Sequence, residues 1–215
     1  MARPAKNDNC TTRNPERTRE RILAAALKEF AAKGFAGARV DVIARRAAIN
    51  KRMLYHYFHD KEGLFRAVLR RKISQRQALL EAASGEPADT LPCWFAANCK
   101  DADLVRLLEW EALQSAGKKV IDEKARCAAA ARAVKRIREQ QARGQVSDEL
   151  DAQHTLLAMV SLTMFPVAFP QLTQIIMGRP ATDPKFQRER AEFLGKFAAA
   201  FQPAKAQRAK NLSVK

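Results

Sequence analysis

A short segment around residue 50 concentrates side chains that could bind a polyanion. Lys51 and Arg52 come first, and Tyr55 and His56 follow about one helical turn later. Lysine, arginine and tyrosine donate hydrogen bonds to phosphate oxygens, and arginine or lysine also recognises the edges of guanine bases. Grouped on one short helix, these residue types favour a surface that contacts nucleic acid. The alternative is an ordinary solvated helix face.

The elements that must position this segment are four helices, expected at 15–33, 40–47, 51–57 and 61–83. In the two longer ones apolar residues recur every three or four positions, which gives each helix one packing stripe. Asn14 and Asp60 are suited to cap helix N-termini. Gly34 is suited to end the first helix in a left-handed conformation, with Phe35 folded back onto the last turn.

Two short helices joined by a tight turn before Asn50 predict a helix-turn-helix. Asn50 caps the second short helix, which is small enough to enter the major groove of DNA. Leu54 and Phe58 are expected in the core, whereas Tyr57 suits either the core or a contact. Lys61 opens the next helix, where its ammonium and the helix amides can both bind phosphate.

Three stretches of this region resemble the DNA-binding region of TetR-type regulators. They are V-I-A-R-R-A at 42–47, I-N-K-R-M-L-Y-H-Y-F at 49–58 and D-K-E-G-L-F at 60–65, within a match that covers about residues 17–70. The resemblance implies a homodimer that binds a palindromic double-stranded DNA operator and is released by a small-molecule effector. By motif position, it implies DNA contacts at Lys51, Arg52, Tyr55, His56, Tyr57 and Lys61.

Two residues depart from the pattern of that family. Ala48 stands in the turn where the family usually has glycine, so we expect an altered or strained turn. Arg39 stands before the second helix, where the family commonly has Ser or Thr as a cap. Arg39 is not a good capping residue, but it remains a candidate phosphate contact.

The charge distribution also favours polyanion binding at the N-terminal end. The chain has a formal net charge of +16. Residues 1–72 hold 18 Lys and Arg against 7 Asp and Glu, a balance of +11. Neutralising phosphates releases counterions and drives association. A protein that coats DNA without sequence preference would share this charge, but it would need neither the polar short helix nor a large apolar C-terminal part.

The chain is expected to be all-α and to divide into four segments. These are a disordered basic arm at 1–13, a TetR-type helix-turn-helix domain at 14–83, a helical ligand-binding and dimerisation domain at 84–203, and a disordered basic tail at 204–215. Ser-Gly-Glu-Pro at 84–87 marks the boundary between the two domains. Helices of the second domain are expected at 88–99, 101–116, 119–143, 148–177 and 184–201.

The segment 154–177 is apolar on all sides, so its helix should be covered on two faces. One face can pack on its own core and the other on a second copy of the chain. A helix-turn-helix needs such a dimer to hold two reading helices about one DNA turn apart. The alternative is a central core helix of a monomer. Pro166 and Pro170 should kink or split this helix, which fits a ligand cavity and plain packing equally.

A pocket for a small molecule would lie between the middle helices of the second domain. Candidate apolar walls are Trp94, Phe95, Trp110, Met159 and Phe165, and candidate polar anchors are Glu109, Glu111 and His154. Each of these residues also fits an ordinary core or surface role. Ligand binding could reach the DNA through the fourth helix, if that helix continues into the pocket.

Other functional classes find little support in the sequence. We find no phosphate-binding loop, zinc-protease helix or nucleophile elbow, so neither an enzyme nor a cofactor is expected. The four cysteines are expected to be free thiols, with a metal or redox sensor at Cys93 and Cys99 as the alternative. No apolar run is long enough to span a membrane and the N-terminus does not resemble a signal peptide, so a cytoplasmic protein is expected.

Overall fold

The computed structural model describes residues 14–82, 87–114 and 120–200. These residues form ten α-helices and no strand, which confirms the all-α prediction. The chain contains many alanines and leucines and few glycines, a composition that favours helices.

The chain divides into two units, Met1–Val68 and Leu69–Lys215. The predicted arm at 1–13 and tail at 204–215 lie outside the described residues, as does most of the predicted linker at 84–87. Those three predictions therefore remain predictions.

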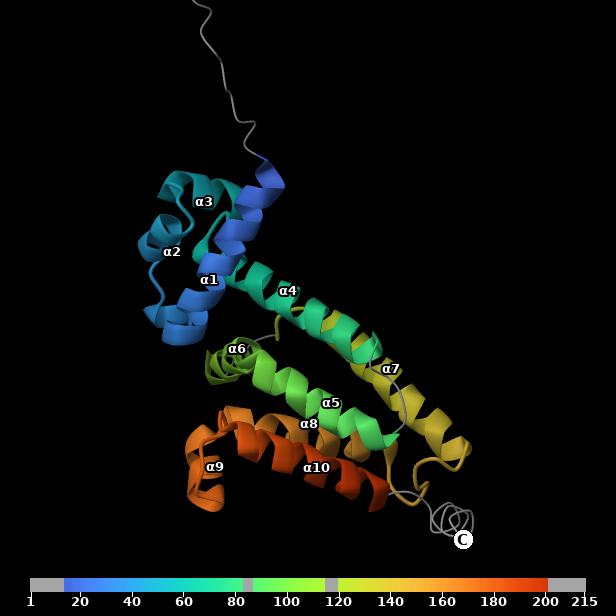
Figure 1. The fold of residues 1–215 in the computed structure, drawn as a ribbon. Helices are drawn as coiled ribbons and strands as arrows, with labels where there is room; N and C mark the ends of the chain where they lie inside the picture. The colour runs from blue at the N-terminus through green and yellow to red at the C-terminus, as the bar shows by residue number, and fades with distance from the viewer. Residues whose placement is uncertain (1–13, 83–86, 115–119, 201–215) are drawn as a thin grey trace, which may run out of the picture. The chain divides into compact units, whose positions relative to one another are not determined.

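The N-terminal unit contains α1 (Pro15–Gly37), α2 (Val40–Arg46), α3 (Lys51–Phe58) and the first turns of α4 (Lys61–Ala82) (Figure 1). Its core is made by apolar side chains that recur at helical spacing. Six of them have no solvent exposure: Ile22, Ala26, Phe30, Ile43, Leu54 and Leu64. Removing this apolar surface from water is the main favourable contribution to the stability of the unit.

Three aromatic rings join the end of α1 to the start of α4. The ring centroid of Phe30 lies 6.3 Å from that of Phe35 and 5.1 Å from that of Phe65, and Phe35 and Phe65 are 5.6 Å apart. Phe35 thus folds back onto α1, as predicted. The prediction that Gly34 ends the helix is only partly right, because Gly34 breaks it with φ 67° and ψ −179° and a further turn follows to Gly37.

The predicted N-terminal caps of α1 and α4 are both formed. The Asn14 side chain accepts a hydrogen bond from the Glu16 N–H at 3.0 Å, and Pro15 occupies the first helical position. Asp60 accepts from the Gly63 N–H at 2.6 Å. Each cap satisfies a backbone donor that the helix itself leaves unpaired, a contribution of about 1 kcal/mol.

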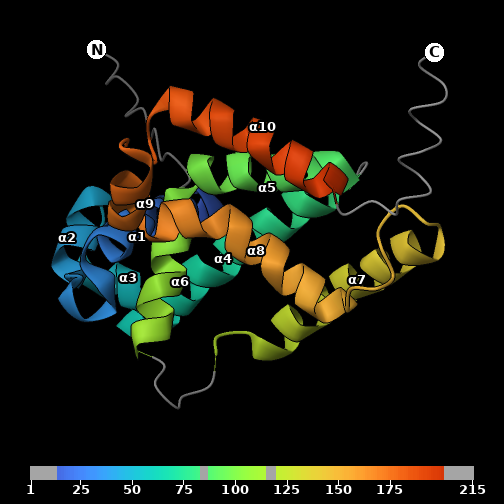
Figure 2. The same ribbon diagram turned by 90° about the horizontal axis from the view of Figure 1, so that it is seen from below.

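The C-terminal unit contains the rest of α4, followed by α5 (Pro87–Lys100), α6 (Ala102–Gln114), α7 (Glu123–Ala142), α8 (Ala152–Ala168), α9 (Pro170–Met177) and α10 (Pro184–Ala200). Helix α5 packs against α10 and α8, and α6 and α7 also pack against α8 (Figure 2). Leu91 and Phe95 of α5 meet Phe186 and Leu194 of α10 in the core of this unit.

The single helix predicted over 148–177 is instead two helices, α8 and α9, which are bent by 89°. Helix α8 starts at Ala152 because Asp151 caps it. Pro170 occupies the first position of α9, so the predicted split occurs there, while Pro166 stays inside α8. Among the described residues no single helix is long and apolar enough to cross a membrane, although α8 and α9 would pass that test if taken together.

A largely buried ion pair joins α6 to the first turn of α7. The Glu111 side chain, 7% exposed, accepts from Arg126 at 2.7 Å and from the Ile121 N–H at 3.0 Å. The Arg126 side chain is 26% exposed. The Glu111 carboxylate is therefore compensated mainly by partners within the protein.

We expect Glu111→Ala to lower the free energy of unfolding by about 2–3 kcal/mol. Breaking a fully buried pair costs about 3–5 kcal/mol, and the partial exposure of Arg126 reduces that loss. Urea denaturation followed by circular dichroism would measure the change. Glu189→Ala removes a half-exposed acid that pairs at 3.4 Å and should change stability by less than about 0.5 kcal/mol. Equal effects of the two variants would contradict this assignment.

Candidate nucleic-acid interface

Helix α3 has one buried face and one exposed face. Leu54 is 0% and Phe58 is 4% exposed, as predicted, and they fix the helix to the core of the N-terminal unit. The Asn50 side chain accepts from the Met53 N–H at 2.7 Å and caps the helix. Because Leu54 and Phe58 occupy the inner face of α3, its polar side chains lie on the outer face.

The exposed face of α3 presents a row of hydrogen-bond donors and rings. Lys51, Arg52, Tyr55 and His56 are all exposed, and Tyr57 is half-buried. The Lys51 ammonium lies 5.8 Å from the centre of the Tyr55 ring. No acid stands in the first turn of the helix, so nothing there would repel a phosphate. This face can donate hydrogen bonds to phosphates and to base edges.

The turn between α2 and α3 has the hydrogen bonds of a Schellman motif. The Ala48 N–H donates to the Arg45 carbonyl and the Ile49 N–H to the Ala44 carbonyl, both at 3.0 Å. Ala48 has φ 50°, in the left-handed region. For a residue with a Cβ this conformation costs about 1–2 kcal/mol. The predicted strain of the turn is therefore present.

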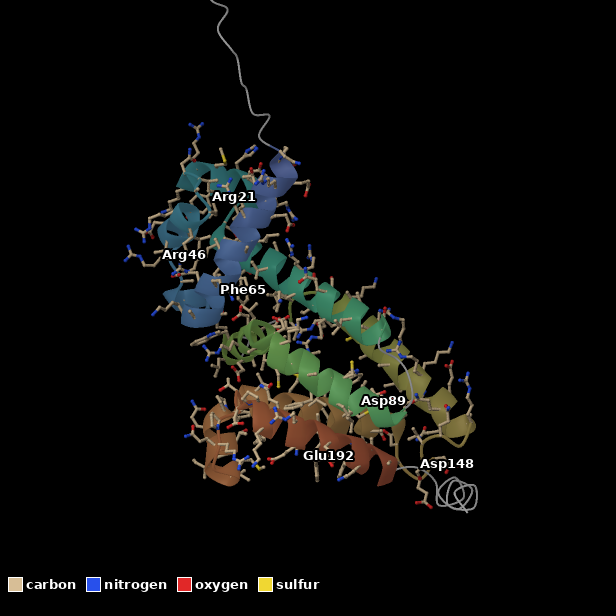
Figure 3. The ribbon with its side chains drawn as sticks, viewed as in Figure 1. Arg21, Arg46, Phe65, Asp89, Asp148 and Glu192 are labelled. Atoms are coloured by element: carbon tan, nitrogen blue, oxygen red, sulfur yellow. The ribbon has the colours of Figure 1, made fainter. Side chains whose placement is uncertain are left out.

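Arg21 on α1 stabilises this turn, a role that the sequence does not predict. Its guanidinium donates to the Ala47 carbonyl and, at 3.1 Å, to the Ala48 carbonyl. These carbonyls lie at the end of α2, where a positive charge is also favoured by the helix dipole. Figure 3 labels Arg21 on α1. The position of α3 thus depends on a side chain from a distant part of the sequence.

A second missed residue, Glu29, ties α1 to α2. Glu29 is 6% exposed and accepts from Arg46 at 2.8 Å and from the Arg39 N–H at 3.4 Å. The Arg39 side chain does not cap α2, as expected, and instead pairs with Asp41 at 3.3 Å. The only sequence signal for Glu29 is its place beside the apolar stripe of α1, next to Phe30.

Lys61 is directed back onto α1. Its ammonium donates to the Ala36 carbonyl at 3.2 Å and lies 4.9 Å from the centre of the Phe35 ring. Nearby, a Cβ on Gly63 would lie 2.4 Å from the Phe58 carbonyl oxygen, so only glycine fits where α4 begins.

The C-terminal unit contains two neighbouring cavities. One, of about 150 Å³, lies between α5, α7, α8 and α10 and is lined mostly by apolar residues, including Trp94, Met159 and Leu162. The other, of about 290 Å³, lies between α4, α5, α6, α7 and α8 and includes Arg76, Asn98 and, again, Trp94 in its wall. We call them the apolar compartment and the polar compartment.

The cavities account for two of the five predicted apolar wall residues. Trp94 lines both compartments and Met159 lines the apolar one. Phe95 lines neither compartment: it is 1% exposed, packs edge-on against Phe186, 6.2 Å away, and borders a separate recess of about 240 Å³ between α5 and α10. Trp110 and Phe165 line neither compartment, and Phe165 is 40% exposed beside Phe169.

The predicted polar anchors do not line the two compartments. Glu111 is occupied by its ion pair with Arg126, and His154 is exposed at the start of α8. Burial raises the pKa of Glu109, although the positive charge of Arg106 acts in the opposite direction and lowers it. Burial also raises the pKa of the Cys99 thiol to about 11, which disfavours the reactive thiolate. Within the part of the chain that the structure describes, no three metal-ligating side chains gather.

Comparison with known proteins decides the family. The family model for bacterial regulatory proteins of the tetR family matches residues 22–68, and the model for the tetracyclin repressor-like C-terminal domain matches residues 93–198. The HTH-type transcriptional repressor SCO4008 of Streptomyces coelicolor is 34% identical over 172 residues, which cover 77% of this chain and 86% of that protein. The chain belongs to the TetR family. It is therefore a helix-turn-helix regulator of transcription that binds DNA.

Other TetR-type proteins agree with this assignment. The repressor NicS of Pseudomonas putida is 40% identical over 79 residues, which cover 35% of this chain and 37% of that protein. The solved structure of the transcriptional regulator SCO4942 of Streptomyces coelicolor matches with a TM-score of 0.71 and 31% identity, over 86% of this chain and 98% of that one. Salmonella enterica GusR matches in fold, with a TM-score of 0.68 at 19% identity over 88% of this chain and 97% of that one.

The TetR-type turn offers a test of backbone strain, because the same chain contains a matched turn with glycine. At the end of α7, the Gly144 N–H donates to the Gln141 carbonyl and the Gln145 N–H to the Gln140 carbonyl, both at 2.9 Å. Gly144 has φ 68° where Ala48 has φ 50°. The two turns differ in whether a Cβ stands at the left-handed position.

We expect Ala48→Gly to raise the free energy of unfolding by about 0.5–1 kcal/mol, because relief of the left-handed strain exceeds the added entropy of the unfolded chain. Gly144→Ala should lower it by a similar amount, since a Cβ there would meet no atom within 4 Å and the loss is purely conformational. Thermal unfolding would show shifts of opposite sign, about 2–4 °C per kcal/mol. A fall in stability for Ala48→Gly would refute the strain.

Proposed function

We propose that this TetR-family regulator is a homodimeric, cytoplasmic repressor that binds a palindromic operator through α3 and is released by a small molecule. The observation that carries the proposal is the exposed, acid-free face of α3, fixed from behind by Leu54 and Phe58. The relatives SCO4008 and NicS are both named as transcriptional repressors, which supports the direction of regulation.

The DNA contacts in this proposal fall into two groups. Arg52, Tyr55 and His56 would face base edges and nearby phosphates in the major groove. Lys51 and Tyr57 would contact the backbone beside them. Arg39 and Lys61 would add phosphate contacts from the flanks, after leaving their present intramolecular partners.

The cost of freeing these flanking residues is small. The Arg39 and Asp41 side chains are 73% and 54% exposed, and exposed pairs contribute only about 0–1 kcal/mol. The Lys61 ammonium bonds to a neutral carbonyl on the surface. A phosphate is a stronger partner for either cation.

We expect Arg52→Ala to weaken binding to DNA from upstream of the protein's own gene by about 1–3 kcal/mol, while binding to unrelated duplex changes much less. Fluorescence-anisotropy titration at several salt concentrations, with unrelated duplex as competitor, would measure both. Lys135→Ala on α7 removes the same charge from a side chain that is 79% exposed in the C-terminal unit. That control should leave both affinities within about a factor of two. Equal affinity for every duplex would instead identify a general DNA-coating protein.

The dimer in this proposal uses the apolar surface of α8, α9 and α10. The large apolar side chains left exposed there are Leu157, Val160, Phe165, Phe169, Leu172, Ile175, Ile176, Met177 and Phe193. Ile175 and Ile176 are the most exposed, at 76% and 68%. Several large apolar side chains exposed on the same helices favour an interface, and a two-fold operator requires a two-fold protein. The part of this surface on α8 and α9 would serve as the second covered face that the sequence predicts for 154–177.

We expect Ile176→Glu to convert the dimer to a monomer, because a carboxylate would be buried at the interface without a partner. Light scattering after size-exclusion chromatography would report the mass, and operator affinity should fall together with dimerisation. Leu113→Glu is the control, since Leu113 is 73% exposed on α6, outside the proposed interface. A monomeric wild type, or a dimer that survives Ile176→Glu, would count against this surface.

The release step in this proposal runs through α4. Its first turns belong to the N-terminal unit, and Ile73, Arg76 and Gln77 from its middle line the polar compartment. A ligand that changes the position of α4 can therefore change the spacing of the reading helices in the dimer. To do so it must favour the state that does not bind DNA, typically by about 1–3 kcal/mol.

A further inference from the structure

The apolar and polar compartments share part of their walls. Trp94, Ala133, Arg136 and Leu156 line both of them. The compartments therefore meet along a boundary formed by α5, α7 and α8. One ligand can occupy both, with chemically different ends on the two sides of this boundary.

The compartments differ in charge. The apolar compartment has a single charged wall residue, Arg136. The polar compartment is lined by Arg76, Arg126 and Arg136, with Glu81 as its one acid. Its charged residues lie within a largely apolar wall, where an uncompensated charge interacts strongly with a ligand.

Two of these charges are already paired. Arg126 binds Glu111 at 2.7 Å, and Glu81 binds Arg132 of α7 at 3.3 Å. Arg136 has no hydrogen-bond or ion-pair partner among the described residues. The boundary between the compartments thus presents an unpaired guanidinium.

Arg76 adds a second positive charge without a bonded acid. Its guanidinium donates to the Asn98 side-chain oxygen and, at 2.9 Å, to the Ala97 carbonyl, both neutral acceptors. Burial lowers the pKa of Arg76, although the negative charge of Asp101 acts to raise it. Asp101 forms its own ion pair, with Lys72 at 2.6 Å. An anion in the polar compartment would therefore gain favourable interactions with both Arg76 and Arg136.

We propose that the two compartments bind an organic carboxylic acid, with its apolar body in the apolar compartment and its carboxylate on Arg136. Arginine suits this role because its planar guanidinium can bind both oxygens of a carboxylate. Trp94 stands at the boundary and contacts the body of the ligand. This inference rests on the proposed ligand-responsive function and names the chemical class of the effector.

The test uses Trp94 as the reporter. The chain has two tryptophans, so Trp110→Phe leaves Trp94 as the single indole. Octanoate, octanol and octylammonium share a tail and differ in the charge of the head, and phenylacetate with phenylethanol forms a second matched pair. Each probe is titrated against the full-length protein while Trp94 fluorescence is followed.

We expect each carboxylate to bind roughly tenfold or more tightly than its alcohol, with octylammonium the weakest of the octyl probes. Arg136→Gln should reduce the preference for carboxylate by at least fivefold while octanol still binds, because only Arg76 then remains to attract the anion, and Arg136→Lys should restore part of it. Arg138→Gln, on the exposed side of the same helix, should leave the preference unchanged. Circular dichroism and urea unfolding establish that each variant is folded.

Two outcomes would overturn the inference. One is a carboxylate that binds no better than its alcohol, or not at all. The other is a carboxylate preference that Arg136→Gln leaves undiminished. A separate operator titration with octanoate then tests the proposed function. If octanoate binds but operator affinity is unchanged, the acid site stands and octanoate does not act as an inducer. If operator binding is tight and no probe binds, the DNA-binding proposal stands and the acid site fails.

Discussion

The position of α3 depends on the short turn before it. Four residues, 47–50, reverse the chain between α2 and α3, and one of them, Ala48, takes a left-handed conformation at a cost of about 1–2 kcal/mol. The two backbone hydrogen bonds of the Schellman motif and the Arg21 guanidinium offset that cost, because each net hydrogen bond contributes about 1 kcal/mol. The turn then places Leu54 and Phe58 in the core, so the donors of α3 are on the solvent side. A looser turn would leave the same residues without a fixed direction.

The features that the sequence predicts correctly are local. Asn14, Asn50 and Asp60 cap helices because their side chains reach amides only two or three residues away. The fold-back of Phe35 is local in the same way. The contacts that it does not predict join distant segments, such as Arg21 with Ala47 and Glu29 with Arg46. Helical periodicity identifies which face is buried, but it does not identify the polar partner that arrives from another helix.

The two cavities show the same limit of sequence-based prediction more clearly. An aromatic residue on an apolar stripe suits the core, a cavity wall or an interface, and all three occur here. Phe95 lies in the core, Trp94 in the cavity wall, and Phe165 on the exposed apolar surface. Composition does not separate these roles, because the cavity exists only where side chains from α4, α5, α7 and α8 fail to fill the space between them. Arg136 was missed because an arginine on a predominantly polar helix is usually solvated.

In the proposed release step, α4 would respond to a bound acid through its polar contacts in the C-terminal unit. Arg70 pairs with Asp122 at 2.5 Å, Lys72 with Asp101 at 2.6 Å, and Arg76 donates to Asn98. The Arg70 guanidinium also lowers the pKa of Asp122, but Arg70 is 63% exposed, so water and salt weaken this pair. Polar contacts of this kind can exchange partners at little cost, whereas a packed apolar interface resists small shifts. A carboxylate that drew Arg76 away from Asn98 would disturb one of the contacts that hold the middle of α4. The coupling of about 1–3 kcal/mol that regulation requires is comparable to the strength of a few such contacts.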